Sequence, residues 1–89
     1  MADDYIVLPH SIYKKDKNGR ILSEITFPEK EPGRYDIERT YVSEALFGSG
    51  EAEKLVSMAV RQIKDAGGTF SASCPFARKY LKEHPDLAR

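Results

Sequence analysis

The spacing of apolar residues changes period once along the chain, close to its middle. Over the first half, apolar and polar residues alternate, which is typical of strands that bury one face. Three segments carry this pattern: 5–8, which can extend past Pro9 through Ile12 and Tyr13, then 20–27 and 35–42. In the second of them, alternation predicts one shared face for Ile21, Ser23, Ile25 and Phe27.

Turn residues separate these segments. Asn18-Gly19 favours a tight hairpin turn, because both residue types tolerate a positive φ. Pro9 indicates an edge position or a bulge, since proline has no N–H to donate to a neighbouring strand. A loop before the third segment is marked by Pro28, Pro32 and Gly33. The first half therefore predicts antiparallel strands joined by short connections.

The second half follows the period of an α-helix. Apolar residues recur on one stripe, made of Ala52, Leu55, Val56, Ala59, Ile63 and Ala66. The solvent-facing side is predicted to hold Glu51, Glu53, Lys54, Arg61, Lys64 and Asp65. Gly67 and Gly68 end this helix, and 69–74 follows as a short strand. Pro75 is well placed to begin a second helix over 76–83, which His84-Pro85 ends.

The order of strands, helix, strand and helix predicts an α+β fold, a mostly antiparallel sheet with two helices packed on it. A length of 89 residues suits one domain spanning 1–89. Lys and Arg balance Asp and Glu at 14 each, so no net charge favours nucleic acid or an anionic membrane. The acidic start, Met1 to Asp4, lacks a signal-peptide pattern, and we expect a cytoplasmic protein. A single cysteine and two separated histidines argue against a disulfide and a dedicated zinc site.

A glycine-rich stretch, 46–52, stands between the third extended segment and the first helix. Gly48 and Gly50 let the backbone approach a ligand closely, and the first N–H groups of the helix have no partner within it. Together with the helix dipole, this arrangement is typical of a phosphate or pyrophosphate site. An ordinary glycine-rich turn is the alternative. The charges of Glu51 and Glu53 count against tight phosphate binding there.

Cys74 lies where the last strand ends and the second helix begins. A thiol at a helix N-terminus can have a lowered pKa, because the dipole and free N–H groups favour the thiolate. The alternative is a small buried side chain without chemical function, which is a common environment for a free cysteine.

Taken together, these residues resemble a small, single-domain branch of the GNAT superfamily of N-acetyltransferases. The resemblance covers about 20–85 and rests on Thr40-Tyr41-Val42, Gly48-x-Gly50-x-Ala52, the helix 53–66 and Cys74-Pro75-Phe76-Ala77-x-x-Tyr80 with His84-Pro85. It implies a GNAT-like fold with a strand–loop–helix site for acetyl-CoA. It also implies that Val42 pairs with pantetheine, and that the pyrophosphate is held by Phe47, Gly48, Ser49, Gly50, Glu51 and Ala52. Cys74 would then lie close to the thioester, with Phe76 and Tyr80 either in the core or flanking the cofactor.

The sequence also departs from the superfamily. Phe47 stands where Arg or Gln is common, Glu51 where an apolar residue is common, and Arg39 where this branch often has histidine. The helices with which larger members build the acceptor site are absent. We expect an acetyltransferase that transfers the acetyl group of acetyl-CoA to a small-molecule or protein amine, as a monomer or weak dimer. The departures at positions 39 and 47 favour the first of two alternatives, a non-catalytic CoA-binding module, and the second is a small interaction domain. A basic face that could contact the 3′-phosphate of CoA holds Arg78, Lys79, Lys82 and Arg89.

Overall fold

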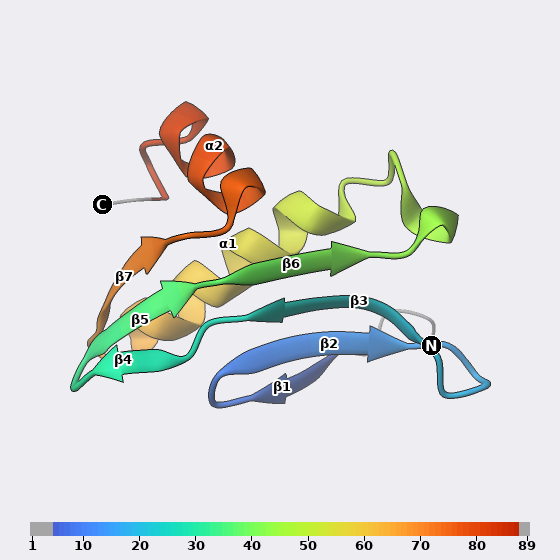
Figure 1. Cartoon of the computed structure of the whole chain (residues 1–89), viewed down its shortest axis with the longest axis horizontal. Coiled ribbons are helices and arrows are strands. Elements are labelled where there is room, and N and C mark those ends of the chain that lie inside the picture. The colour runs from blue at the N-terminus through green and yellow to red at the C-terminus, as the bar shows by residue number, and fades with distance from the viewer. Residues whose placement is uncertain (1–4, 88–89) are drawn as a thin grey trace.

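The computed structural model describes residues 5–87, so the prediction for Met1 to Asp4 lies outside them. The elements follow one another as β1 (Ile6–Leu8), β2 (Ser11–Lys15), β3 (Ile21–Thr26), β4 (Glu29–Glu31), β5 (Arg34–Ile37), β6 (Arg39–Val42), a 3₁₀ turn η1 (Glu44–Leu46), α1 (Glu51–Asp65), β7 (Thr69–Ala72) and α2 (Pro75–Glu83). They form a four-stranded sheet in the order β1-β2-β3-β6 and a three-stranded sheet in the order β4-β5-β7 (Figure 1).

The N-terminal strands form two consecutive hairpins. The predicted extension of the first strand past Pro9 is wrong, because the chain turns at Pro9 and His10 and returns as β2. The predicted turn between β2 and β3 is present, although only Gly19 and not Asn18 adopts a positive φ, of +84°. There the Asp16 carboxylate accepts hydrogen bonds from the backbone N–H groups of Asn18, at 2.8 Å, and Arg20, at 3.0 Å.

The segment predicted as one strand, 35–42, is divided between the two sheets. β5 pairs antiparallel with β4 and parallel with β7, whereas β6 pairs antiparallel with β3. Glu38 stands at the junction, and its backbone N–H donates to the carbonyl of Thr26. The loop predicted before this segment contains the short strand β4. One extended run of sequence therefore links the sheets, because its hydrogen-bonding partners change at Glu38.

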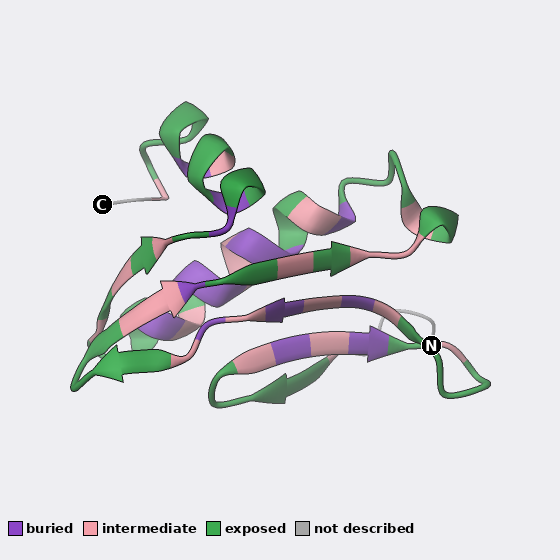
Figure 2. Cartoon of the chain, viewed as in Figure 1, coloured by how far each residue is buried: buried purple, intermediate pink, exposed green. Residues whose placement is uncertain are grey.

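Helix α1 packs across one face of the strands and, with them, forms the core. The buried apolar residues are Ile12, Ile25, Phe27, Ile37, Leu55, Val56, Ala59, Val60, Ile63, Cys74, Ala77 and Leu81. Figure 2 shows buried positions alternating with more exposed ones along β2 and β3. The sequence prediction is wrong about the burial of two residues of α1 and its C-terminal end. Glu51 is buried, and Ala66 is exposed because it follows the last helical residue, Asp65.

Strand β7 and helix α2 complete the fold. β7 ends at Ala72, two residues before the predicted end, and α2 begins at Pro75 as predicted. Ala77 and Leu81 are the residues of α2 that are buried in the core. Within 5–87, neither helix is long and apolar enough to cross a membrane.

Candidate functional site

The two sheets separate at the end of the β5–β7 pair. Parallel pairing stops at Ile37 and Ala72, where the carbonyl of Ile37 accepts the N–H groups of Ser73, at 3.1 Å, and Cys74, at 3.0 Å. Beyond this point the chain from Ile37 continues as β6 beside β3, while the chain from Cys74 turns into α2 (Figure 1). β6 is consequently an edge strand. Its outer edge can pair with an extended ligand, since edge strands present backbone N–H and C=O groups.

A glycine loop leads from β6 to α1. The short turn η1, which the sequence pattern did not reveal, is capped by Ser43, whose hydroxyl accepts the N–H of Ala45. Gly48 and Gly50 then adopt φ values of +81° and +82°, and Gly50 is the N-cap of α1. These values lie in the left-handed region that glycine occupies at little cost. The first N–H groups of α1 point toward the loop. Because no side chain caps the helix, these groups are left without a side-chain acceptor, as in known anion sites.

A pocket of about 380 Å³ adjoins this loop. It is lined by Val42, Leu46, Phe47, Gly48, Gly50, Glu51, Ala52 and Glu53. The structure thus brings six of the predicted binding residues together, while Ser49 turns its hydroxyl back to the carbonyl of Leu46 at 2.6 Å. Leu46 and Glu53 join the lining without having been predicted. Their place depends on η1 and on the first turn of α1.

Phe47 and Glu51 occupy very different positions beside this pocket. The side chain of Phe47 is 69% exposed, so an aromatic ring stands at the solvent side of the loop. Glu51, at 7% exposure, instead reaches into the sheet. Its carboxylate accepts hydrogen bonds from the Ser23 hydroxyl at 2.6 Å and the Tyr5 hydroxyl at 2.9 Å, and lies 3.6 Å from the ammonium group of Lys14.

These contacts change the expected effect of Glu51 on an anion. Burial would raise the pKa of Glu51, but the hydrogen bonds from Ser23 and Tyr5 and the charge of Lys14 outweigh it, and the pKa lies below its ordinary value. The carboxylate is therefore charged at neutral pH, and its charge is compensated by a buried lysine. The predicted penalty for phosphate binding is reduced, because the negative charge of Glu51 is engaged beneath the loop.

Cys74 lies at the point where the sheets separate. Its side chain is 6% exposed, and its Sγ is 3.5 Å from the Oγ1 of Thr40 on β6. Burial would raise its pKa, but the contact with Thr40 and the backbone N–H groups of Ala77 and Phe76 outweigh burial and lower the pKa. The thiol of Cys74 is therefore buried and has a pKa below that of an ordinary cysteine.

Helix α2 carries a line of aromatic rings. Phe76 and Tyr80 are stacked with ring centroids 6.1 Å apart, and the His84 ring lies 4.1 Å from that of Tyr80. Phe76 is 37% exposed, whereas Tyr80 packs partly against the core. Neither Phe76 nor Tyr80 is among the residues that line the pocket beside the glycine loop, so the structure does not bring these two predicted binding residues together with the other six. Arg78, from the predicted basic face, donates to the carbonyl of Ala72, and Arg89 lies outside the described residues.

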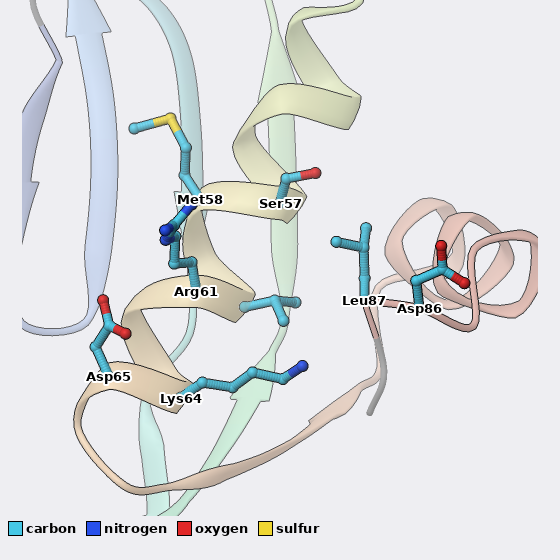
Figure 3. A pocket seen from close by; sticks show the side chains of 8 residues that line it. Ser57, Met58, Arg61, Lys64, Asp65, Asp86 and Leu87 are labelled. Atoms are coloured by element: carbon cyan, nitrogen blue, oxygen red, sulfur yellow. The ribbon is translucent and has the colours of Figure 1, made fainter.

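A second pocket, of about 450 Å³, is found elsewhere, between the C-terminal half of α1 and the segment after α2 (Figure 3). It is lined by Ser57, Met58, Val60, Arg61, Lys64, Asp65, Asp86 and Leu87. None of these is a predicted site residue. His10 is also remote from the loop: its ring lies 5.8 Å from that of Tyr35. No cluster of metal-binding side chains occurs within 5–87.

Comparisons with known proteins agree with this geometry. Residues 11–89 match the family of GCN5-related N-acetyl-transferases. A GCN5-like protein from Staphylococcus aureus, solved by NMR, is 26% identical with a TM-score of 0.81, covering 97% of this chain and 84% of that one. A search among curated proteins gave no match.

Larger acetyltransferases share the fold at lower identity. An IAA acetyltransferase from Bacillus cereus is 20% identical with a TM-score of 0.64, covering 83% of this chain and 52% of that one. A ribosomal-protein-alanine N-acetyltransferase from Brucella melitensis biovar Abortus is 17% identical with a TM-score of 0.58, covering 83% of this chain and 61% of that one. Because the family match spans most of the sequence and the Staphylococcus aureus fold extends over nearly all of it, the chain belongs to the GCN5-related N-acetyltransferase family.

Proposed function

We propose that the protein transfers an acetyl group from acetyl-CoA to an amine. The observation that carries this proposal is the separation of β6 from β7, with the glycine loop at one end of β6 and Cys74 at the other. β7 pairs with β5 and ends at Ala72, so it leaves the outer edge of β6 free. An extended thioester can lie along that edge. The family supports the proposal, since its members are N-acetyltransferases.

The residues present fit the chemistry of CoA. Pyrophosphate is suited to the uncapped start of α1, where Gly48 and Gly50 leave the backbone accessible. Pantetheine carries amide groups that can exchange hydrogen bonds with the edge of β6 around Val42. Phe76, in the first turn of α2, offers an exposed ring. When bound, acetyl-CoA supplies an activated thioester.

The chain would then promote transfer by orientation and by electrostatics. Backbone N–H groups of β6 can polarise the acetyl carbonyl, and the amine nitrogen attacks its carbon. The C–S bond breaks, CoA leaves as a thiolate, and the proton lost by the amine neutralises that thiolate. In a two-step variant, the Cys74 thiolate attacks the acetyl carbon and CoA leaves as a thiolate. The amine then attacks the acetyl group on Cys74, the Cys74 thiolate leaves, and the proton lost by the amine neutralises the CoA thiolate. Arg39 cannot serve as the base, because its guanidinium stays protonated.

Calorimetry followed by product analysis tests the proposal. The purified chain is titrated with acetyl-CoA and then incubated with acetyl-CoA and a panel of primary amines, with N-acetyl products identified by mass spectrometry. We expect saturable binding and acetylated amine. Binding without any product would favour the alternative of a non-catalytic CoA-binding module. If acetyl-CoA and CoA both fail to bind at millimolar concentration, the cofactor assignment is wrong and an interaction domain becomes the better interpretation.

A further inference from the structure

The sheet face opposite α1 carries an unusual row of side chains. α1 lies behind the strands in Figure 1, and no helix of the described chain covers the face turned toward the viewer. Ser23 and Ile25 of β3 are buried on the α1 side, so the side chain of Glu24 between them points to the uncovered face. Tyr13 of β2 and Tyr41 of β6 are its direct cross-strand neighbours.

Glu24 is therefore a carboxylate between two phenol rings. Directly opposed side chains have Cβ atoms about 5 Å apart, so both rings can contact the same small ligand as the carboxylate. Glu24 is half-buried, yet among residues 5–87 it makes no hydrogen bond or ion pair. Lys15 and Arg39 share this face but are not within ion-pair distance of Glu24. A carboxylate on this face that has no partner within the described chain is available to a cation from outside.

The rings on either side favour the same class of ligand. Ammonium groups bind well over the face of an aromatic ring. The structure already contains such a contact, because the ammonium group of Lys15 lies 5.6 Å from the centroid of the Tyr13 ring. Tyr41 is 39% exposed, so its ring is accessible from solvent. The row thus combines a negative charge with the exposed ring of Tyr41 and with the ring of Tyr13, one side of which already carries the Lys15 ammonium group.

The row also ends at the proposed transfer site. Tyr41 follows Thr40, whose hydroxyl contacts Cys74 at the separation of the sheets. One strand spacing, about 4.8 Å, separates β3 from β6, so Glu24 is within reach of a short chain whose other end lies at the outer edge of β6. The α1 side of the gap is filled by the core, which leaves the uncovered face as the approach for an acceptor.

We propose that Glu24, with Tyr13 and Tyr41, binds the second ammonium group of a small aliphatic diamine while its other amine is acetylated. This inference rests on the proposed acetyl transfer and names its acceptor class. Glu24 acts as a specificity-determining residue. It gives a diamine an additional charge-assisted hydrogen bond that a monoamine of the same length cannot make.

Matched amines and matched variants test this assignment. Putrescine and butylamine have the same carbon chain, and only putrescine has a second ammonium group. We expect kcat/KM for putrescine to exceed that for butylamine by about tenfold or more, since hydrogen bonds to charged groups are the stronger ones. Glu24→Gln should bring the two values within about twofold, chiefly by lowering kcat/KM for putrescine. Glu83→Gln, an exposed glutamate of α2, is the control and should retain the preference.

A binding measurement makes the inference independent of turnover. Putrescine added to the full chain should shift the NMR signals of Tyr13, Glu24 and Tyr41, and Glu24→Gln should weaken this binding about tenfold with the rest of the spectrum unchanged. Acetyl-CoA binding and turnover without any diamine preference would overturn the acceptor assignment and leave the proposed function intact. If the wild type does not bind acetyl-CoA, the proposed function itself is wrong. Putrescine shifts that are absent, or equal in Glu24→Gln, would overturn the ammonium site.

Discussion

The Sγ atom of Cys74 lies 3.5 Å from the Oγ1 atom of Thr40, although the two residues belong to segments whose backbones have just separated. Thr40 continues into β6 and the glycine loop, while Cys74 leads into α2. This contact therefore joins the two sides of the gap at its narrow end. It relates the acidity of the thiol to the position of the strand that is proposed to hold the thioester.

The left-handed conformation of Gly50 allows a test of the pyrophosphate site with a matched control. Gly50 and Gly67 have φ values of +82° and +77°, and a Cβ added to either meets no atom within 4 Å. Gly50→Val and Gly67→Val should each reduce the free energy of unfolding by about 2 kcal/mol, from backbone strain alone. Only Gly50→Val should weaken acetyl-CoA binding in calorimetry, because Gly67 lies at the far end of α1. Equal affinities in the two variants would place the pyrophosphate elsewhere.

The helices and the loop could be predicted from sequence because their signals are local. Pro75 begins α2, Gly67 follows α1, and Gly48 and Gly50 mark the loop. The division at Glu38 could not be predicted, since alternation looks the same whichever strand supplies the hydrogen bonds. The turn at Pro9 and His10 could not be predicted for a related reason. The residues on either side of Pro9 favour extended backbone whether the chain continues as one strand or reverses as a hairpin.

The burial of Glu51 was also beyond a pattern analysis. Its helical position indicates the solvent-facing side only if glutamate is assumed to avoid the core. Its partners Lys14 and Ser23 come from strands remote in the sequence, and the fold alone brings them together. The residues that the sequence assigns to the loop, 47–52, lie together because they are consecutive. The proposed role of Glu24 could not be predicted in the same way, because its neighbours Tyr13 and Tyr41 are set by strand register.

Glu51 should contribute to stability through its buried charge. Glu51→Ala removes a carboxylate from beside Lys14 and leaves the Ser23 hydroxyl without its acceptor, so we expect a loss of up to about 3 kcal/mol in the free energy of unfolding. The pKa of Glu51 is lowered in the folded state. Its contribution is thus complete above its ordinary pKa of 4.5 and is lost as the pH falls through the lower, folded value. Urea unfolding of both proteins from neutral to acidic pH should show their stabilities converging in acid.

A cation at position 47 should strengthen the proposed CoA site. Phe47 is 69% exposed beside the pocket, so Phe47→Arg should fold normally and place a guanidinium where phosphate is expected. We expect acetyl-CoA affinity to increase several-fold, which is roughly the contribution of one charge-assisted hydrogen bond. Binding should also become more sensitive to salt. Phe47→Leu is the control for loss of the ring. S-acetyl-pantetheine, which lacks the pyrophosphate, should bind both variants alike, and a gain for this shorter ligand would contradict the assignment.

Cys74 provides the test of mechanism, because its acidity and its chemical role can be measured separately. The pKa of the thiol is lowered, so the pH midpoint of its alkylation by iodoacetamide should fall below 9.0, and Thr40→Val should move the midpoint upward. Burial limits access, so the midpoint and not the absolute rate reports the thiolate. In the folded state the lowered pKa adds stability above pH 9.0, and this contribution is lost as the pH falls through the folded value.

The role of the Cys74 thiolate in acetyl transfer is tested with the variant Cys74→Ala. If Cys74 carries the acetyl group, Cys74→Ala should reduce turnover more than tenfold, a barrier increase of about 1.4 kcal/mol or more, with acetyl-CoA affinity retained. Cys74→Ser is a weaker test, because a hydroxyl remains in place. Mass spectrometry of the wild type mixed with acetyl-CoA alone should then detect acetyl on Cys74. Turnover unchanged in Cys74→Ala would establish direct attack by the amine, with the thiol serving only to pack the narrow end of the gap against Thr40.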